Sequence, residues 1–262
     1  MTAATRMPAP SNTLTILTGA SRGMGHAMAE QLLRQPGTGT LLCLSRQSSD
    51  ALANLAWQHG KTLLQWQVDL ADAPAVAARL QDWLLAQTDE SWDEVRLINN
   101  AGVIPPIAPL AHTAAADIAQ GLRVGLEAAM VLSAVFLHAT GHWPMPRKLL
   151  NISSGLGRYP MASQAVYCAA KAGIDHFSRC VALEEAQHPN GAKVCALAPG
   201  VVATDMQQQL RSAAPKDFPD VQKFIGLHAT GSLQSPAAAA ALVLARLARE
   251  DFGNEPIADV RK

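Results

Sequence analysis

Short apolar runs alternate with longer amphipathic stretches along most of the chain. Residues 14–18 (LTILT) are apolar or β-branched, and residues 24–35 then repeat apolar side chains every three to four positions until Pro36 and Gly37. The same cycle recurs toward the C-terminus. It predicts strands over residues 14–18, 40–44, 62–68, 96–99, 148–153, 194–198 and 256–258, and helices over residues 24–35, 50–59, 74–87, 114–140, 164–186 and 236–249.

The order of these elements predicts the fold class. Strands of about five residues that alternate with helices of ten or more form βαβ units, whose strands are parallel. The predicted strands are apolar almost throughout, which is typical of strands that are covered on both faces. We therefore expect an α/β fold, a single Rossmann-type doubly wound parallel sheet with helices on both faces.

Two segments fall outside this alternation. Residues 1–12 are polar and contain prolines, so we expect a flexible N-terminal tail that precedes one domain over residues 13–262. Residues 207–235 show no strand pattern and contain Pro215 and Pro219. Because this stretch is too long for an ordinary loop, we expect short helices that form a lid.

Composition narrows the possible partners. The chain has 262 residues, 21 basic and 21 acidic side chains, and only 16% charged residues. A neutral chain lacks the basic surface that binds nucleic acid or an acidic membrane, and no apolar run reaches the ~18 residues of a membrane span. We expect neither partner, and the low charge favours burial between subunits.

The four cysteines, at positions 43, 168, 180 and 195, show no spacing that is typical of a metal site or a disulfide framework. We therefore expect four buried thiols in a reducing compartment and no metal. The N-terminal residues lack the apolar core of a secretory signal. Together these features predict a cytoplasmic location.

The turn after the first predicted strand has the pattern of a nucleotide site. Residues 18–25 read TGASRGMG, with glycines at positions 19, 23 and 25. Glycine lets the backbone turn tightly and approach a pyrophosphate, and the following helix N-terminus favours a negative charge. A merely flexible loop is the alternative, but the strand–turn–helix context favours a dinucleotide site.

The residue at the end of the second predicted strand indicates whether the cofactor is NAD or NADP. An acidic residue there would bind the ribose 2′-hydroxyl of NAD, whereas this chain has Arg46. Arg46, with Arg22 from the glycine turn, suits a 2′-phosphate, so we expect NADP(H). The alternative is that Arg46 is only a solvated surface residue. Asp69, after the third strand, either accepts a hydrogen bond from the adenine or caps the next helix.

Tyr167 and Lys171 lie four residues apart on a predicted helix, so their side chains are neighbours on one face. A lysine cation this close should lower the pKa of the tyrosine. A tyrosine tuned in this way can give a proton to a carbonyl oxygen. The alternative is an ordinary pair on a surface helix.

Taken together, these motifs resemble those of the short-chain dehydrogenase/reductase family over residues 12–260. The matching segments are TGASRGMG at 18–25, NNAG at 99–102, NISS at 151–154, YCAAK at 167–171 and PGVVAT at 199–204. The resemblance implies one dinucleotide-binding catalytic domain, an NADP-dependent enzyme acting on a CH–OH/C=O group, a small-molecule carbonyl substrate, and a homodimer or homotetramer.

The resemblance also implies roles for individual residues. Ser154 would orient the substrate carbonyl, Tyr167 would protonate it, and Lys171 would tune Tyr167, while Ser153 would be structural. Gly200 would lie beside the substrate. The expected cofactor-binding residues are Gly19, Ser21, Arg22, Gly23, Met24, Gly25, Arg46, Asp69, Leu70, Asn99, Ala101, Gly102, Tyr167, Lys171, Pro199, Gly200, Val202, Thr204 and Met206.

Residues 181–185 (VALEE) and 198–210 (APGVVATDMQQQL) resemble sepiapterin reductase and the bacterial benzil reductases within this family. That subgroup implies a diketone-type substrate, and Asp259 matches a position that anchors a pterin ring; a structural role is the alternative. Gly125 stands where many members have an asparagine that supports a proton relay. This departure leaves open a catalytically weak NADP-binding sensor or interaction protein.

Overall fold

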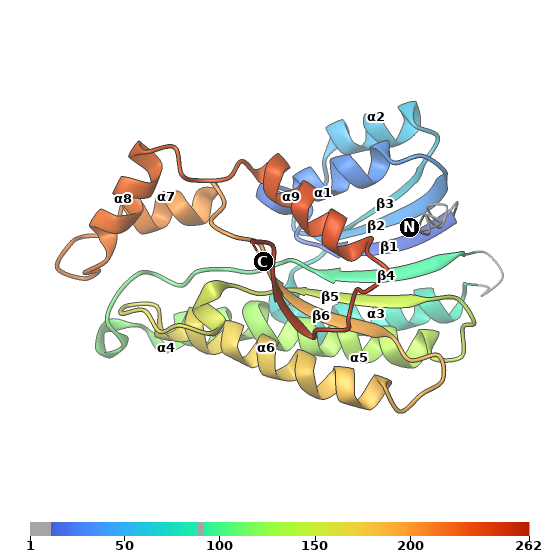
Figure 1. Cartoon of the computed structure of the whole chain (residues 1–262). Coiled ribbons are helices and arrows are strands. Elements are labelled where there is room, and N and C mark those ends of the chain that lie inside the picture. Colours follow the sequence, from blue (N-terminus) through green and yellow to red (C-terminus); the bar gives the residue numbers. More distant parts are fainter. Residues whose placement is uncertain (1–11, 88–91, 262) are drawn as a thin grey trace, which may run out of the picture.

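A parallel sheet runs through the middle of the molecule (Figure 1). The computed structural model describes residues 12–87 and 92–261, and within them the strand order is β3-β2-β1-β4-β5-β6-β7. The strands are β1 (Asn12–Thr18), β2 (Thr38–Ser45), β3 (Thr62–Gln67), β4 (Glu94–Asn99), β5 (Arg147–Ile152), β6 (Lys193–Ala198) and β7 (Ile257–Asp259).

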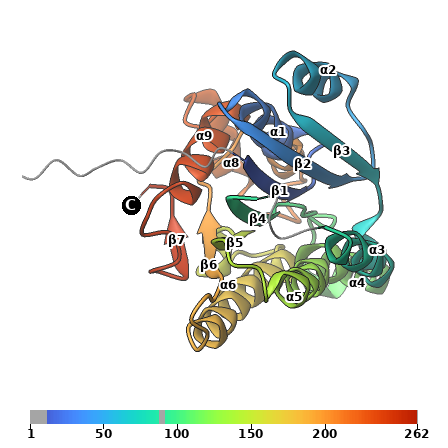
Figure 2. The same cartoon turned by 90° about the vertical axis from the view of Figure 1, so that its right-hand side faces the viewer.

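Helices cover both faces of this sheet (Figure 2). Helices α1, α2 and α9 lie on one face, whereas α3, α5 and α6 lie on the other, and α7 and α8 extend beyond the sheet (Figure 1). The helices are α1 (Gly23–Arg34), α2 (Asp50–Gln58), α3 (Ala73–Leu85), α4 (Ala115–Leu122), α5 (Ala128–Thr140), α6 (Ala165–Glu185), α7 (Asp205–Arg211), α8 (Val221–Ala229) and α9 (Pro236–Leu247).

Each central strand sends alternate side chains into two apolar layers, which is why the strands are apolar almost throughout. One layer packs against α1 and α9, and the other packs against α3 and α5. The first contains Leu17, Cys43, Ile98, Leu150 and Leu197, and the second contains Ile16, Leu42, Leu97, Leu149 and Val194. Because all the described strand pairs are parallel, the carboxyl ends of the strands lie at one edge of the sheet. Open α/β sheets bind ligands at this edge.

The predicted fold class is confirmed, with three local differences. Asn12, expected in the tail, is the first residue of β1, and the rest of the predicted tail (1–11) lies outside the described residues. The helix predicted over 114–140 is interrupted between α4 and α5 by the π-helical turn η4 (Arg123–Glu127). The segment expected to form a lid contains α7 and α8, and α7 begins at Asp205, before the predicted start of that segment.

The expectation of four buried thiols is only partly correct. Cys43 and Cys195 are buried in the sheet, but Cys168 is half-buried and Cys180 is exposed. Burial raises the pKa of Cys43 to about 12 and that of Cys195 to about 11. Cys180 differs because it lies on a part of α6 that faces away from the sheet, where the core does not cover it.

The stretch Ala115–Thr140 is, within the described residues, the one helical segment long and apolar enough to cross a membrane by length and composition. In the fold, its α5 portion packs against α3, and its α4 portion packs against α6. The apolar composition of this segment therefore matches its place in the layer that covers the sheet.

Candidate active site

The glycine turn between β1 and α1 has the geometry that its sequence predicts. Gly19 (φ +72°) and Gly23 (φ +56°) occupy the left-handed region, where a side chain is strained. Gly25 is required for a different reason. A Cβ atom there would lie 2.1 Å from the Gly19 carbonyl oxygen. The turn is therefore built from bare backbone, as close approach of a pyrophosphate requires.

Thr18 and Asn100, which were not among the residues expected to contact the cofactor individually, hold this turn against the end of β4. Thr18 Oγ1 accepts hydrogen bonds from the backbone N–H groups of Asn100 and Ala101, both at 2.9 Å. Asn100 Nδ2 donates to the carbonyl oxygens of Thr18 (2.9 Å) and Gly19 (3.3 Å). The only sequence signal was that both residues stand inside the recognised motifs.

The two arginines expected at the 2′-phosphate are both exposed, but their partners differ. Arg22 Nη1 forms an ion pair with Asp205 Oδ2 at 2.8 Å, which links the glycine turn to α7. Arg46 follows β2 and has no ion pair or side-chain hydrogen bond within the described part of the chain. Arg46 is thus available to an anionic ligand without losing a protein contact.

Asp69 acts as a cap in this structure. Its Oδ1 accepts a hydrogen bond from the Ala71 N–H at 2.9 Å, at the start of the 3-10 turn η1 (Leu70–Asp72). This contact is the capping alternative raised by the sequence. It occupies one carboxylate oxygen.

Asn99 turns its side chain away from the glycine turn. It is buried, and its Nδ2 donates to Asn151 Oδ1 (2.9 Å) and Ser133 Oγ (3.0 Å), which ties β4 to β5 and α5. Side chains alternate along a strand, and this last residue of β4 faces the interior. Only its backbone is left for the expected cofactor contact.

The segment beyond β6 lies close to both the glycine turn and helix α6, which carries Tyr167 and Lys171. A Cβ on Gly23 would lie 3.4 Å from Thr204 Cγ2. A Cβ on Gly102 would lie 3.7 Å from Lys171 Nζ and 3.9 Å from Met206 Cε. The structure thus brings together predicted cofactor-binding residues from four separate segments.

Other predicted cofactor residues offer mainly backbone atoms. Met24 and Val202 are buried in the apolar layer under α1 and α9, and Leu70 is buried in the opposite layer. Gly200 has φ +84°, a left-handed conformation, where the chain leaves β6. The side chains of Met24, Val202 and Leu70 therefore pack in the core, and Gly200 allows the chain to turn after β6.

Ser154, Tyr167 and Lys171 come together at the carboxyl edge. Tyr167 and Lys171 lie on α6, with Lys171 Nζ 5.7 Å from the centre of the tyrosine ring. Ser154 follows β5 and accepts a hydrogen bond from the Leu156 N–H at 3.2 Å. Its hydroxyl is near enough to Tyr167 to lower the pKa of the phenol. This arrangement places an acid, an orienting hydroxyl and a cation in one cluster.

The expected effect of Lys171 on Tyr167 is wrong for this structure. Burial raises the pKa of Tyr167, the Ser154 hydroxyl lowers it, and the nearby Cys168 raises it. Lys171 Nζ instead donates to the Ile152 carbonyl oxygen at 2.7 Å. Burial lowers the pKa of Lys171 to about 8, and the Asp175 carboxylate opposes that shift. At neutral pH the tyrosine keeps its proton and the lysine is predominantly charged.

Gly125 lies in the π-helical turn η4, a feature that is frequent at functional sites. It is buried, and a Cβ there would lie 3.2 Å from Ala170 Cβ on α6. The position therefore faces the helix that carries Tyr167 and Lys171. A side chain at position 125 would be in tight contact with that helix.

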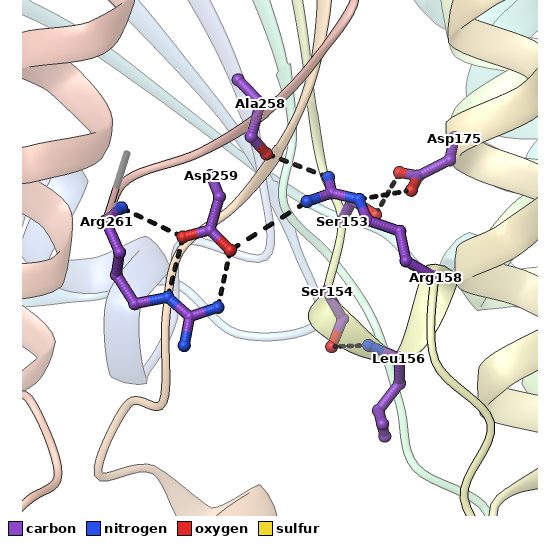
Figure 3. Close-up of polar contacts among 8 residues, drawn as sticks. All are labelled: Ser153, Ser154, Leu156, Arg158, Asp175, Ala258, Asp259 and Arg261. Carbon is purple, nitrogen blue, oxygen red and sulfur yellow. Dashed lines mark hydrogen bonds and ion pairs between the residues drawn. The ribbon is translucent and has the colours of Figure 1, made fainter.

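Asp259 is engaged by neighbouring arginines (Figure 3). Its carboxylate accepts hydrogen bonds from Arg261 Nε (2.8 Å) and Nη2 (2.6 Å), and Arg158 Nη1 lies 4.0 Å from Oδ2. The Arg261 hydrogen bonds dominate in lowering the pKa of Asp259 to about 2. These contacts fit the structural role that the sequence left as an alternative for Asp259.

Helices α7 and α8 and the chain between them enclose a small apolar cluster of their own. Leu210, Phe218, Val221 and Phe224 are buried there and pack against Ile104, which follows β4. The hydroxyl of Ser163, just before α6, donates to the Asp217 carbonyl oxygen between α7 and α8. A small cavity beside Tyr167 is lined largely by apolar side chains, among them Pro105, Pro106, Leu110 and Val166.

A Rossmann-type sheet with a Ser–Tyr–Lys cluster at its carboxyl edge defines a class of oxidoreductases that act on carbonyl and alcohol groups. The family model described as short chain dehydrogenase matches residues 13–215. The chain therefore belongs to the short-chain dehydrogenase/reductase family.

Individual relatives span nearly the whole chain. Benzil reductase ((S)-benzoin forming) of Bacillus cereus is 34% identical over 237 residues, which cover 90% of this chain and 94% of the relative. Sepiapterin reductase of Rattus norvegicus is 30% identical over 247 residues, which cover 90% and 92%. The crystal structure of the KRED1-Pglu enzyme matches with a TM-score of 0.77 at 26% identity, covering 92% of this chain and 98% of that one.

Proposed function

We propose that this reductase uses NADPH to reduce one carbonyl of an aromatic 1,2-diketone of the benzil type. The observation that carries the proposal is the 34% identity to a benzil reductase along almost its entire length. The clustering of Ser154, Tyr167 and Lys171 supports it, because these groups suit protonation of a carbonyl oxygen.

The residues of the glycine turn fit a dinucleotide. A Cβ at Gly25 would fill the turn, and Arg46 is free of protein partners within the described residues. In our proposal the turn holds the pyrophosphate, while Arg46 and Arg22 hold the 2′-phosphate. Bound NADPH supplies a hydride to the carbonyl carbon.

The protein groups handle the oxygen of the substrate. The Tyr167 hydroxyl, whose pKa is raised by burial, donates its proton to the carbonyl oxygen as negative charge develops there. Ser154 Oγ donates a hydrogen bond to the same oxygen and so orients it. Lys171 Nζ, 5.7 Å from the centre of the Tyr167 ring, places a positive charge beside the proton donor.

The C-terminal segment favours a benzil-type substrate over a pterin. A pterin anchored by Asp259 would need a free carboxylate, whereas both oxygens of Asp259 are bound by Arg261. Sepiapterin is therefore the second substrate to test.

NADPH consumption by the purified protein tests the proposal with benzil, sepiapterin and simple ketones. We expect turnover with benzil and its loss in Tyr167→Phe with NADPH binding kept. Tight NADPH binding without consumption of any substrate would favour the sensor alternative, for which Gly125 is the supporting feature.

Assembly and location stay predictions. Leu183 on α6 (71% exposed) and Met130 on α5 (41% exposed) leave apolar side chains uncovered on neighbouring helices. A homodimer or homotetramer that covers them fits the low charge of the chain, and sedimentation velocity measures it. The cytoplasmic location stays a prediction, which cell fractionation measures.

A further inference from the structure

One buried carboxylate lies between the two elements that carry the catalytic residues. Asp175 is on α6, one helical turn beyond Lys171, and is only 2% exposed. It accepts a hydrogen bond from Ser153 Oγ, and its other oxygen pairs with Arg158 Nε at 3.1 Å (Figure 3). Asp175 thus bridges α6 and the end of β5.

The contact with Ser153 acts on the neighbouring catalytic serine. Ser153 immediately precedes Ser154, and its backbone N–H donates to the Leu197 carbonyl oxygen of β6 at 2.9 Å. Its hydroxyl is bound to Asp175 on the other side. The backbone that carries Ser154 is therefore held from both β6 and α6.

Arg158 extends this arrangement to the C-terminal strand. Its Nη2 donates to the Ala258 carbonyl oxygen at 2.9 Å, and its Nη1 lies 4.0 Å from Asp259, which Arg261 also binds. Ser153, Arg158, Asp175, Asp259 and Arg261 form one connected set, which we call the Asp175 network (Figure 3).

We propose that Asp175, held by Arg158, is a positioning residue that fixes Ser154 and the charge of Lys171 relative to Tyr167. The proposal rests on the proposed reductase function for its kinetic test. It assigns Asp259 and Arg261 to the support of the catalytic cluster, through Arg158.

Several charged or titratable groups on the elements around α6 surround Lys171 together with Asp175. Asp175 is the charge that acts against the burial of Lys171, and it lies on the same helix. Tyr167 is the titratable neighbour on the other side of Lys171. The elements packed against α6 contribute Asp117 (α4), Arg123 and Glu127 (η4), Arg158 (after η5, Gly155–Gly157), Lys193 and Cys195 (β6) and Asp259 (β7).

Two variants should move the titration of Lys171 in opposite directions. Asp175→Asn keeps a hydrogen-bond acceptor for Ser153 but removes the negative charge, so the pKa of Lys171 should fall by about one unit. Arg158→Gln removes the cation that shares Asp175, so the pKa of Lys171 should rise by a smaller amount. A purely structural defect would lower kcat equally at every pH.

The kinetic test follows kcat for benzil against pH in the wild type and both variants. The rate should fall above the pKa of Lys171, near pH 8 in the wild type. That decline should begin at lower pH in Asp175→Asn and at higher pH in Arg158→Gln. Arg158→Lys should restore the wild-type profile, and Asp251→Asn, in an exposed ion pair with Arg249, should leave it unchanged.

A second readout needs no substrate and separates this proposal from the proposed function. Lysine labelled with ¹³C at Cε reports the titration of Lys171 by NMR, with its signal assigned by loss in Lys171→Arg. Opposite shifts in the two variants support the network even if benzil is not reduced. Equal or absent shifts in both variants overturn it. If Asp175→Asn does not fold, an unchanged titration in Arg158→Gln overturns it alone.

Discussion

At the carboxyl edge of the sheet, the glycine turn and helix α6, which carries Tyr167 and Lys171, hold their charged side chains in different ways. Arg22 and Arg46 are exposed, with Asp205 as the one protein partner of Arg22 and none for Arg46 within the described residues. Lys171 and Asp175 are buried and bound to fixed partners. Exposed cations remain available to a ligand, whereas a buried cation is held in place by its protein partners.

This difference predicts which substitutions affect binding and which affect chemistry. Changes at the glycine turn should alter cofactor affinity, because in the proposed function that region binds the cofactor through its backbone and solvated cations. Changes on α6 should alter kcat and its pH dependence. Four substitutions test this division between binding and chemistry, in order from the largest expected effect to the smallest.

Tyr167→Phe should give the largest loss. Removal of a general acid costs about 10²–10⁴-fold in rate, and the phenyl ring keeps the packing of α6. We expect kcat for benzil to fall by that factor, while the NADPH dissociation constant, measured by fluorescence titration, changes by less than about threefold. A variant with normal turnover would remove Tyr167 from the chemistry.

Gly25→Ala should disrupt the turn itself. The new Cβ would lie 2.1 Å from the Gly19 carbonyl oxygen and 2.5 Å from Asn100 Nδ2. Overpacking of this kind costs about 1–3 kcal/mol, so thermal unfolding should shift down and NADPH binding should weaken strongly. Gly226→Ala is the matched control, because a Cβ there meets nothing within 4 Å and alanine favours the helix α8. Equal behaviour of the two variants would contradict the close packing of the turn.

Arg46→Ala should separate the two nicotinamide cofactors. Loss of a charge-assisted contact to the 2′-phosphate costs about 1.5–3 kcal/mol, which is roughly 10- to 150-fold in affinity. We expect that loss for NADPH and almost none for NADH in parallel titrations. Arg249→Ala removes another exposed arginine and should change neither. Equal losses for both cofactors would reject the phosphate role of Arg46.

Asp205→Asn should have the smallest effect, and in the opposite direction. It frees Arg22 from an ion pair between two largely exposed side chains. Such pairs contribute about 0–1 kcal/mol, so NADPH binding should tighten by up to about fivefold and NADH binding should not change. Weaker NADPH binding would mean that Arg22 needs Asp205 to reach its ligand.

The sequence predicted the fold well because its signals are local. Strand and helix positions follow from the spacing of apolar residues, and the glycine turn follows from Gly19, Gly23 and Gly25 in a strand–turn–helix context. The cluster of Ser154, Tyr167 and Lys171 followed from motif resemblance.

The features that sequence reasoning missed depend on three-dimensional packing. The inward direction of Asn99 depends on which face of β4 it occupies. The raised pKa of Tyr167 depends on burial, which a helical spacing of four residues does not reveal. The link from Asp175 through Arg158 to Asp259 joins residues 17 and about 100 positions apart. No local pattern encodes such contacts.

Transfer of deuterium tests the central claim most directly. The purified protein is incubated with benzil and NADPH that carries deuterium at the transferred position of the nicotinamide, and the product is analysed by mass spectrometry and NMR. We predict a hydroxyketone with the deuterium on the new carbinol carbon, and no such product with Tyr167→Phe. Oxidation of the cofactor without labelled hydroxyketone, or the same product yield from Tyr167→Phe, would contradict the account.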